Sequence, residues 1–202
     1  MRKYENSPIV ISGPSGSGKS ELVTYIENNY PVFSEAIGMT TREKRKNEVG
    51  KINFVSKNEF ENMIKSDVLI EYCIYNDNYY GIPKSEFNKL NDYRVIFNVG
   101  YSSAKEIKKI YHNTDMIYLL PPSNEELLRR LGDRNKKRYL LGMKETIENA
   151  LKYDFLLISA TDDFEKITSD FFDIIDRGPC CSQKRLILAK NKDFVNNFYR
   201  NR

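Results

Sequence analysis

Residues 13–20 read GPSGSGKS, an unbroken phosphate-loop pattern of the form G-x-x-x-x-G-K-[ST]. An apolar run, 8–11, stands directly before this loop, and a helical pattern, 21–26, follows it. Such a loop needs a buried strand before it, a tight turn, and a helix that starts at its end. The pattern therefore predicts a strand–loop–helix unit that binds the phosphates of a nucleoside triphosphate.

Each position in the loop has an expected role. Glycines let backbone N–H groups converge on phosphate oxygens because they carry no Cβ, and the helix N-terminus adds partial positive charge. We expect Lys19 to reach the β- and γ-phosphates and the Ser20 hydroxyl to ligate Mg²⁺. The predicted triphosphate-binding residues are Gly13, Ser15, Gly16, Ser17, Gly18, Lys19 and Ser20.

The composition fits one soluble globular domain. A chain of 202 residues is long enough to bury a core without disulfides or bound metals. Its composition, 30% charged and 40% hydrophobic residues, is ordinary for a soluble domain. No apolar stretch approaches the length of a membrane span, and residues 1–6 lack a hydrophobic signal core. We therefore expect no membrane partner and a cytoplasmic location.

The three cysteines form no metal-binding or redox motif. Cys73 lies in an apolar run, so we expect it in the core. Cys180 and Cys181 are adjacent near the start of the C-terminal region, where we expect reduced surface thiols; a redox or lipidated role is the alternative. His112 has no evident partner and receives no catalytic role.

Much of the positive charge gathers at the C-terminus. The net charge is +4, and residues 177–202 hold seven Lys and Arg residues against one Asp. We favour an amphipathic helix that docks on the domain over a contact with nucleic acid or another subunit. A nucleic-acid partner is therefore not expected, whereas an oligomer is possible.

Apolar runs alternate with helical patterns along most of the chain. This alternation predicts βαβ crossovers and a parallel sheet covered by helices. Residues 40–93 break the rhythm with short alternating runs, which favours an inserted, partly antiparallel subdomain. The predicted strands are 8–12, 33–38, 94–99, 116–120 and 155–159, and the predicted helices are 19–29, 102–111, 124–131, 143–153 and 164–176.

A second set of residues suits a phosphate and a base. Arg42 and Arg45 stand three residues apart after a predicted strand, and guanidinium forks suit a phosphate dianion. Glu71 ends an apolar run and is a natural acceptor for paired N–H donors. Residues 78–81 are predicted to form a turn that exposes the phenol of Tyr80.

A basic cluster, 129–138, crosses from a helix into a loop. By itself this pattern is typical of a solvated helix end. Beside an intact phosphate loop, we favour cations that close over transferring phosphates.

These segments together resemble the guanylate kinase family over about residues 7–176. The phosphate loop alone indicates only a large superfamily, whereas the arginine pair, the glutamate and the Tyr-Gly pair make the resemblance specific. The matching segments are 13–20, 40–45, 53–60, 70–71, 79–81, 120–123 and 130–134.

The resemblance implies an α/β, three-layer P-loop NTPase fold with a parallel central sheet. It implies a single domain with a CORE of about 1–37, 94–132 and 142–176, a nucleoside-monophosphate-binding insertion of about 38–93, and a short LID of about 133–141, followed by the basic extension 177–202. It also implies ATP with Mg²⁺ as donor and a nucleoside monophosphate as acceptor. Arg42, Arg45 and Tyr80 would hold the acceptor phosphate, Glu71 would read the base, and Lys19, Arg42, Arg134 and Arg138 would be catalytic.

The chain departs from the family pattern around the monophosphate. Gly38 stands where the family usually has Ser, Ile52 where a phosphate-binding Tyr is expected, and Ile82 where a Ser or Thr helps read the guanine carbonyl. The family runs Asp-x-Asp after the central strand, whereas this chain has Asn98 and Gly100 at the two aspartate positions. A Walker-B-like carboxylate and a base-reading carboxylate are therefore missing at these positions.

Three functions remain open from the sequence. The leading one is ATP-dependent phosphorylation of a nucleoside monophosphate, most simply GMP or dGMP. A catalytically weakened protein that binds a nucleotide or a protein partner is the first alternative. A kinase with a changed acceptor is the second, because Ile82 and Gly100 argue against strict reading of guanine.

Overall fold

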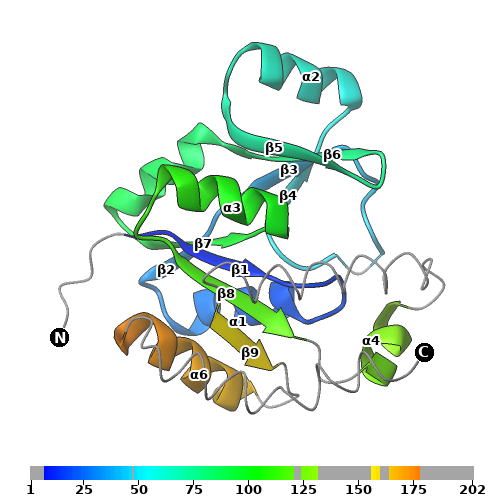
Figure 1. The fold of residues 1–202 in the computed structure, drawn as a ribbon. Helices are drawn as coiled ribbons and strands as arrows, with labels where there is room; N and C mark the ends of the chain where they lie inside the picture. The colour runs from blue at the N-terminus through cyan, green and yellow to red at the C-terminus, as the bar shows by residue number, and fades with distance from the viewer. Residues whose placement is uncertain (1–6, 47, 121–123, 132–155, 160–163, 178–202) are drawn as a thin grey trace.

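A computed structural model describes residues 7–46, 48–120, 124–131, 156–159 and 164–177 (Figure 1). Within this part of the chain the strands form two sheets. The first sheet has five strands, and every pairing in it is parallel. Its order is β2 (Phe33–Glu35), β7 (Arg94–Asn98), β1 (Ile9–Ser12), β8 (Asp115–Leu120) and β9 (Leu156–Ser159). The predicted α/β fold with a parallel sheet is confirmed.

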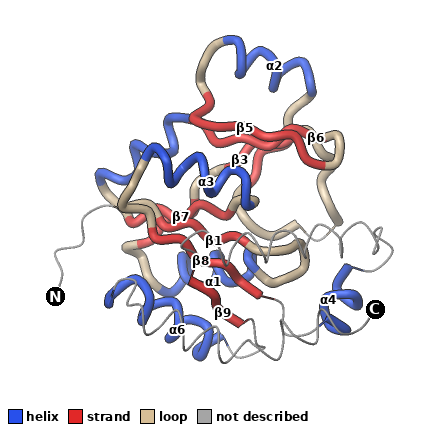
Figure 2. Tube along the Cα trace, viewed as in Figure 1, coloured by secondary structure: helices blue, strands red, loops and turns tan. Residues whose placement is uncertain are grey.

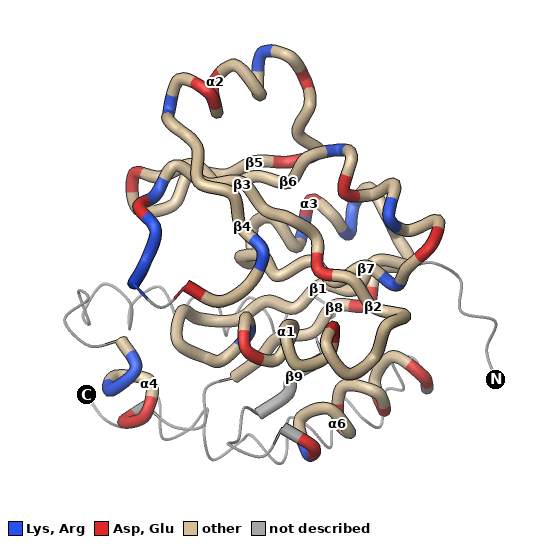
Figure 3. Tube along the Cα trace, turned by 180° about the vertical axis from the view of Figure 1, so that it is seen from behind, with Lys and Arg blue, Asp and Glu red and all other residues tan. Residues whose placement is uncertain are grey.

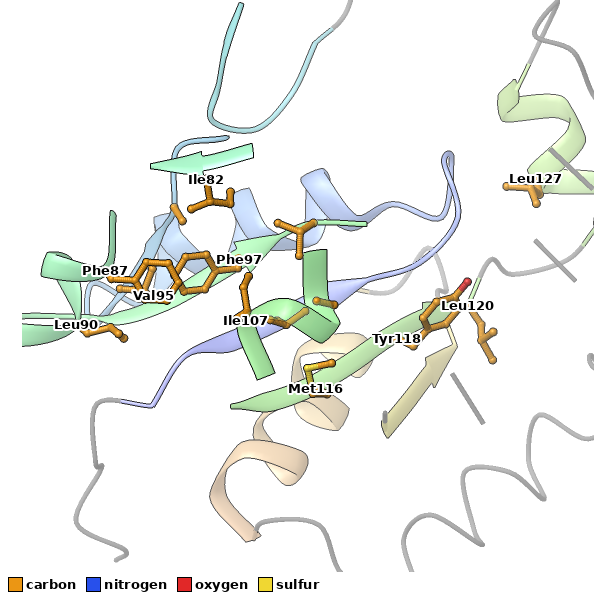
Figure 4. Close-up of a cluster of buried hydrophobic side chains, with 14 of the residues drawn as sticks. Ile82, Phe87, Leu90, Val95, Phe97, Ile107, Met116, Tyr118, Leu120 and Leu127 are labelled. Carbon is orange, nitrogen blue, oxygen red and sulfur yellow. The ribbon is translucent and has the colours of Figure 1, made fainter. Parts of the chain in front are cut away.

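Helices cover both faces of this sheet, which makes three layers. On one face, Ile9 and Ile11 of β1 pack with side chains of α1 (Lys19–Asn29) and α6 (Phe164–Arg177). On the other face, Val10 belongs to a cluster with Phe97 of β7 and Ile107 of α3 (Tyr101–Ile110) (Figure 4). A strand buried on both faces has no polar side, which explains the continuous apolar runs in the sequence.

The second sheet has four strands and mixed directions. Its order is β4 (Ile52–Phe54), β3 (Gly38–Thr40), β6 (Asn78–Pro83) and β5 (Leu69–Tyr75). β6 runs antiparallel to β3 and β5, whereas β3 and β4 are parallel. Helix α2 (Lys57–Lys65) starts at a capping box in which Ser56 and Glu59 exchange hydrogen bonds. The 3₁₀ helix η1 (Lys84–Asn91) leads back to the first sheet, and α3 contacts both sheets (Figure 2).

The predicted strand 33–38 is wrong as one element, because the chain changes sheets inside it. The Ala36 N–H still donates to the Ile96 carbonyl of the first sheet at 2.9 Å, but the Gly38 N–H donates to the Lys51 carbonyl at 3.1 Å. Between them, the Ile37 N–H donates to the Glu86 carboxylate at 2.7 Å. A side chain thus satisfies the Ile37 N–H at the point where the chain passes from one sheet to the other.

The predicted turn at 78–81 is also wrong, because these residues form β6. The chain reverses instead at Asn76 and Asp77, whose φ angles are 50° and 62°. Asn and Asp tolerate this left-handed conformation better than other residues with a Cβ. Cys73 is half-buried rather than in the core.

Several predictions lie outside the described residues. These are the helix 143–153, the LID segment 133–141, the extension beyond residue 177, and the residues Arg134, Arg138, Cys180 and Cys181. Among the helices that are described, none has both the length and the apolar character needed to span a bilayer.

Candidate active site

The phosphate loop joins β1 to α1 at the carboxyl end of the parallel sheet (Figure 1). Gly16 and Gly18 have φ angles of 86° and 92°, which residues with a Cβ rarely adopt. A Cβ on Gly13 would lie 2.4 Å from the carbonyl oxygen of Leu119 in β8. Glycine at position 13 therefore permits the close approach of the loop to the neighbouring strand, and α1 begins with its positive end at the loop.

Lys19 folds back over this loop. Its Nζ donates hydrogen bonds of 2.9 Å to the carbonyl oxygens of Gly13 and Pro14. Burial lowers the pKa of Lys19 to about 8, with Glu21 opposing this shift and Arg45 adding to it. A phosphate anion here would restore the charged form, because an opposite charge favours it.

A cavity of about 560 Å³ opens beside the loop. Three segments far apart in the sequence line it, namely the loop with the start of α1, the segment after β3, and α4 (Asn124–Leu131). Seen from behind, the basic segment after β3 and helix α4 lie on the same side of the molecule (Figure 3). The lining residues are Ser15, Gly16, Gly18, Lys19, Ser20, Glu21, Arg45, Glu48, Val49 and Arg130.

Arg130 brings helix α4 onto the loop. Its Nη1 lies 3.5 Å from the carbonyl oxygen of Gly16, and its Nε donates to Glu126 at 2.6 Å. Arg129 binds the same carboxylate but is 74% exposed, against 26% for Arg130. Hydrogen bonds from the two arginines lower the pKa of Glu126 to about 2. Glu126 thus fixes Arg130 where it lines the cavity.

Arg42 is held by an internal carboxylate. Its Nη1 and Nη2 donate to the two oxygens of Glu48 at 2.8 and 2.7 Å, and its guanidinium lies 5.2 Å over the ring of Phe54. Burial works to lower the pKa of Arg42, but Glu48 and Tyr80 together raise it. Glu48 also accepts a hydrogen bond from the Arg45 N–H at 3.2 Å. Glu48 therefore joins the two predicted arginines and orients the fork of the first.

Glu71 is a residue of β5 whose side chain meets Ser103 of α3, and it does not line the cavity. It is 7% exposed, and its Oε2 has no hydrogen-bond partner among the described residues. Burial raises the pKa of Glu71 to about 7, opposed by a hydrogen bond with Ser103 and supported by the charge of Glu106. A buried acceptor with an unused oxygen is suited to a ligand that brings N–H donors.

Three positions where the chain departs from the family pattern, Gly38, Ile82 and Gly100, can be located in the structure. Ile82 pairs with Glu71 across β5 and β6 and is buried in the apolar cluster. A Cβ on Gly100 would meet nothing within 4 Å, and one on Gly38 would make ordinary contacts with Ile52 and Ile82. Neither glycine is therefore required by packing.

Ser20 has polar neighbours that fit a magnesium site. The Asn98 Nδ2 donates to Ser20 Oγ at 3.1 Å and to Glu35 Oε1 at 3.2 Å. Burial raises the pKa of Glu35, while hydrogen bonds from Asn98 and the Lys51 N–H oppose the shift. Hydroxyl and carboxylate oxygens are among the ligands that Mg²⁺ prefers, whereas the Asn98 Nδ2 only donates hydrogen bonds to them. Ser20 and Glu35 thus fit this ion, with Ser20 nearest the loop.

The structure brings some predicted site residues together and leaves others apart. Lys19, Ser20 and Arg45 line one cavity, and Arg42 meets Tyr80 beside it through the contacts described above. Arg134 and Arg138 lie outside the described residues. Sequence reasoning did not single out Glu35, Glu48, Ser103 or Arg130 as site residues, although Arg130 belongs to the basic cluster that it noted.

The chain matches the guanylate kinase family model over residues 5–177. It is 35% identical to the guanylate kinase of Buchnera aphidicola over 179 residues, which cover 82% of this chain and 85% of that protein. It is 37% identical to the guanylate kinase of Rickettsia felis over 180 residues, or 83% of this chain and 91% of that one. The crystal structure of guanylate kinase from Anaplasma phagocytophilum superposes with a TM-score of 0.67 at 21% identity, over 94% of this chain and 95% of that chain, which supports the fold. The chain therefore belongs to the guanylate kinase family of nucleoside monophosphate kinases.

Proposed function

We propose that this protein transfers the γ-phosphoryl group of ATP to GMP or dGMP and releases ADP and the nucleoside diphosphate. The cavity beside the phosphate loop carries the proposal, because Lys19, Arg45 and Arg130 line it from three separate segments. Three cations around one cavity suit a reaction in which charge spreads over transferring phosphate oxygens.

On the donor side, the residues of the loop would hold ATP. Backbone N–H groups and Lys19 would bind the phosphates, and the Ser20 hydroxyl would hold Mg²⁺. When bound, the metal neutralises charge on the β- and γ-phosphates. Arg130 lies over Gly16 and adds positive charge at the phosphates. Arg134 and Arg138 would close over them from a LID at about 133–141.

On the acceptor side, Arg42, Arg45 and Tyr80 would bind the monophosphate, and Glu71 would read the base. An oxygen of the acceptor phosphate attacks the γ-phosphorus, and the bond from that phosphorus to the β-phosphate oxygen breaks. The acceptor oxygen is already anionic, so no general base is needed. The reaction would be accelerated by in-line positioning of the two nucleotides and by neutralisation of the charge on the transferring phosphate.

The acceptor site lies on a segment of about 38–93, which we propose is the monophosphate-binding insertion. The CORE would then consist of about 1–37, 94–132 and 142–176. We also propose a cytoplasmic location, where free nucleotides are available as substrates.

A changed choice of base is the second candidate, and Ile82 favours it. This side chain is buried in the apolar cluster, so it offers no hydrogen bond to a guanine carbonyl. Gly100 likewise offers no carboxylate. Each missing contact weakens discrimination by about 1–3 kcal/mol.

The test is an ADP-release assay with GMP, dGMP, AMP, UMP and IMP as acceptors. We expect GMP or dGMP to be the best substrate, with turnover reduced about 100-fold or more in Lys19→Ala and sharply reduced in Glu71→Ala. Preference for another acceptor would favour the changed base. ATP binding without turnover on any acceptor would refute the kinase assignment.

A further inference from the structure

Asn98 connects Ser20 to a buried carboxylate. One nitrogen, Nδ2, donates to Ser20 Oγ at 3.1 Å and to Glu35 Oε1 at 3.2 Å. A single donor therefore holds the hydroxyl of the phosphate loop and the carboxylate of Glu35 close together. This is the position where the family pattern has the first aspartate of its Asp-x-Asp.

The register of the sheet brings Glu35 to this point. Glu35 ends β2 and pairs with Ile96 of β7, two residues before Asn98. Residues two apart on a strand share a face, so the side chains of Glu35 and Asn98 lie on the same face. Asn98 itself pairs with Ile11 of β1, the strand that leads into the phosphate loop.

Glu35 is 2% exposed, and both carboxylate oxygens accept hydrogen bonds. Oε1 accepts from Asn98, and Oε2 accepts from the Lys51 N–H at 3.0 Å. Burying a carboxylate costs free energy even when it is hydrogen-bonded, and an amide could accept the same bonds without a charge. A carboxylate at this position, rather than an amide, is therefore suited to a cation as a further partner.

Gly50 leaves the space that this arrangement needs. Its φ is 95°, and a Cβ there would lie 3.3 Å from Glu35 Oε1 and 3.4 Å from Ser20 Oγ. Glu35 and Ser20 therefore border one small region at the mouth of the phosphate loop.

We propose that Glu35, held beside Ser20 by Asn98, supplies the negative charge of the magnesium site that the family pattern places on aspartate at position 98. Glu35 is a positioning residue: its carboxylate is held beside Ser20 by the Asn98 Nδ2, which donates to both side chains. The carboxylate would thus lie on β2, whereas the family pattern places it on the neighbouring strand β7. This inference rests on the proposed function, because it deepens the role of Ser20 in binding Mg²⁺.

The experiment measures binding, so it does not depend on the acceptor. Calorimetry gives the affinity of a non-hydrolysable ATP analogue with and without Mg²⁺, and the ratio of the two affinities reports the metal. Electron paramagnetic resonance of Mn²⁺ added with the same analogue gives the metal affinity directly. We expect Glu35→Gln to reduce the ratio and the Mn²⁺ affinity about 10- to 100-fold, as for partners that orient metal ligands.

Two variants separate this role from a structural one. Glu86 is also a buried carboxylate, and among the described residues it accepts bonds from the Ile37 N–H and from Lys89 but not from Asn98, so Glu86→Gln should leave the ratio unchanged. The double variant Glu35→Gln, Asn98→Asp exchanges the carboxylate and the amide, and should recover most of the lost metal dependence. An unchanged ratio in Glu35→Gln, or no recovery in the exchanged pair, would overturn the inference. Turnover of the wild type with an acceptor tests the proposed function separately.

Discussion

At the scale of single residues, Lys19 links nucleotide binding to pH. Its pKa is lowered to about 8 in the free protein, mainly by burial, and bound phosphates favour the charged form. Binding of ATP above pH 8 should therefore take up a proton, so the affinity falls as the pH rises through that region. Calorimetry in two buffers of different ionisation enthalpy measures the uptake, and Lys19→Met should abolish it. Binding without proton uptake in the wild type would contradict this role.

Glu71 links the stability of the folded protein to pH. Burial raises its pKa to about 7 from 4.5, so the folded state binds more protons than the unfolded state between these values. The free energy of unfolding should then decrease as the pH rises from about 4.5 to 7, by on the order of 2 kcal/mol for this group.

Glu71→Gln should flatten this dependence, measured by urea denaturation at several pH values. Glu43→Gln, at an exposed position, is the control and should keep the slope of the wild type. Equal slopes in the wild type and Glu71→Gln would show that Glu71 is not the group responsible.

Motif spacing predicted Lys19, Ser20, Arg42 and Arg45, because each follows a local pattern that fixes its place. Glu48 and Glu35 were not predicted, because their importance comes from tertiary partners. Glu48 matters only when its carboxylate meets Arg42, and Glu35 only when β2 pairs with β7. Neither carries a spacing signal that separates it from the other glutamates in the sequence.

At the scale of elements, α4 should act on nucleotide binding through one of its two adjacent arginines. Arg130 reaches Gly16 and lines the cavity, whereas Arg129 binds the same Glu126 but faces outward. Arg130→Ala should weaken ATP binding about 10- to 100-fold, as expected for loss of a charged contact. Arg129→Ala should change it less than about threefold. Equal effects of the two changes would mean that α4 acts only through its stability.

Among the described residues, the elements around the parallel sheet were predicted to within one residue at each end, apart from the strand 33–38, whereas α2 was not predicted. The ranges 19–29 and 124–131 agree with α1 and α4, because apolar periodicity and charged first turns mark both helices. The run 33–38 looked like one strand because the sequence pattern does not reveal where a chain changes sheets. Residues 78–81 looked like a turn because of their Tyr-Gly composition, whereas Asn76 and Asp77 supply the positive φ angles.

At the scale of the whole molecule, the parallel sheet carries the phosphate loop, and the second sheet carries the two arginines. The segment after β3 reaches back to the loop, so Arg45 lines the same cavity as Lys19. The alternation of strands and helices predicted this architecture, since only a parallel sheet accommodates it. The meeting of Arg45 with the loop was not predictable from local patterns, because the two segments belong to different sheets.

We propose that the two anion sites face each other across one cavity. The binding of a bisubstrate analogue that joins adenosine and guanosine through five phosphates tests this arrangement. We predict that one molecule binds per chain, more tightly than ATP or GMP alone, and that excess ATP and excess GMP each displace it. Displacement by ATP with no effect of GMP would contradict the claim.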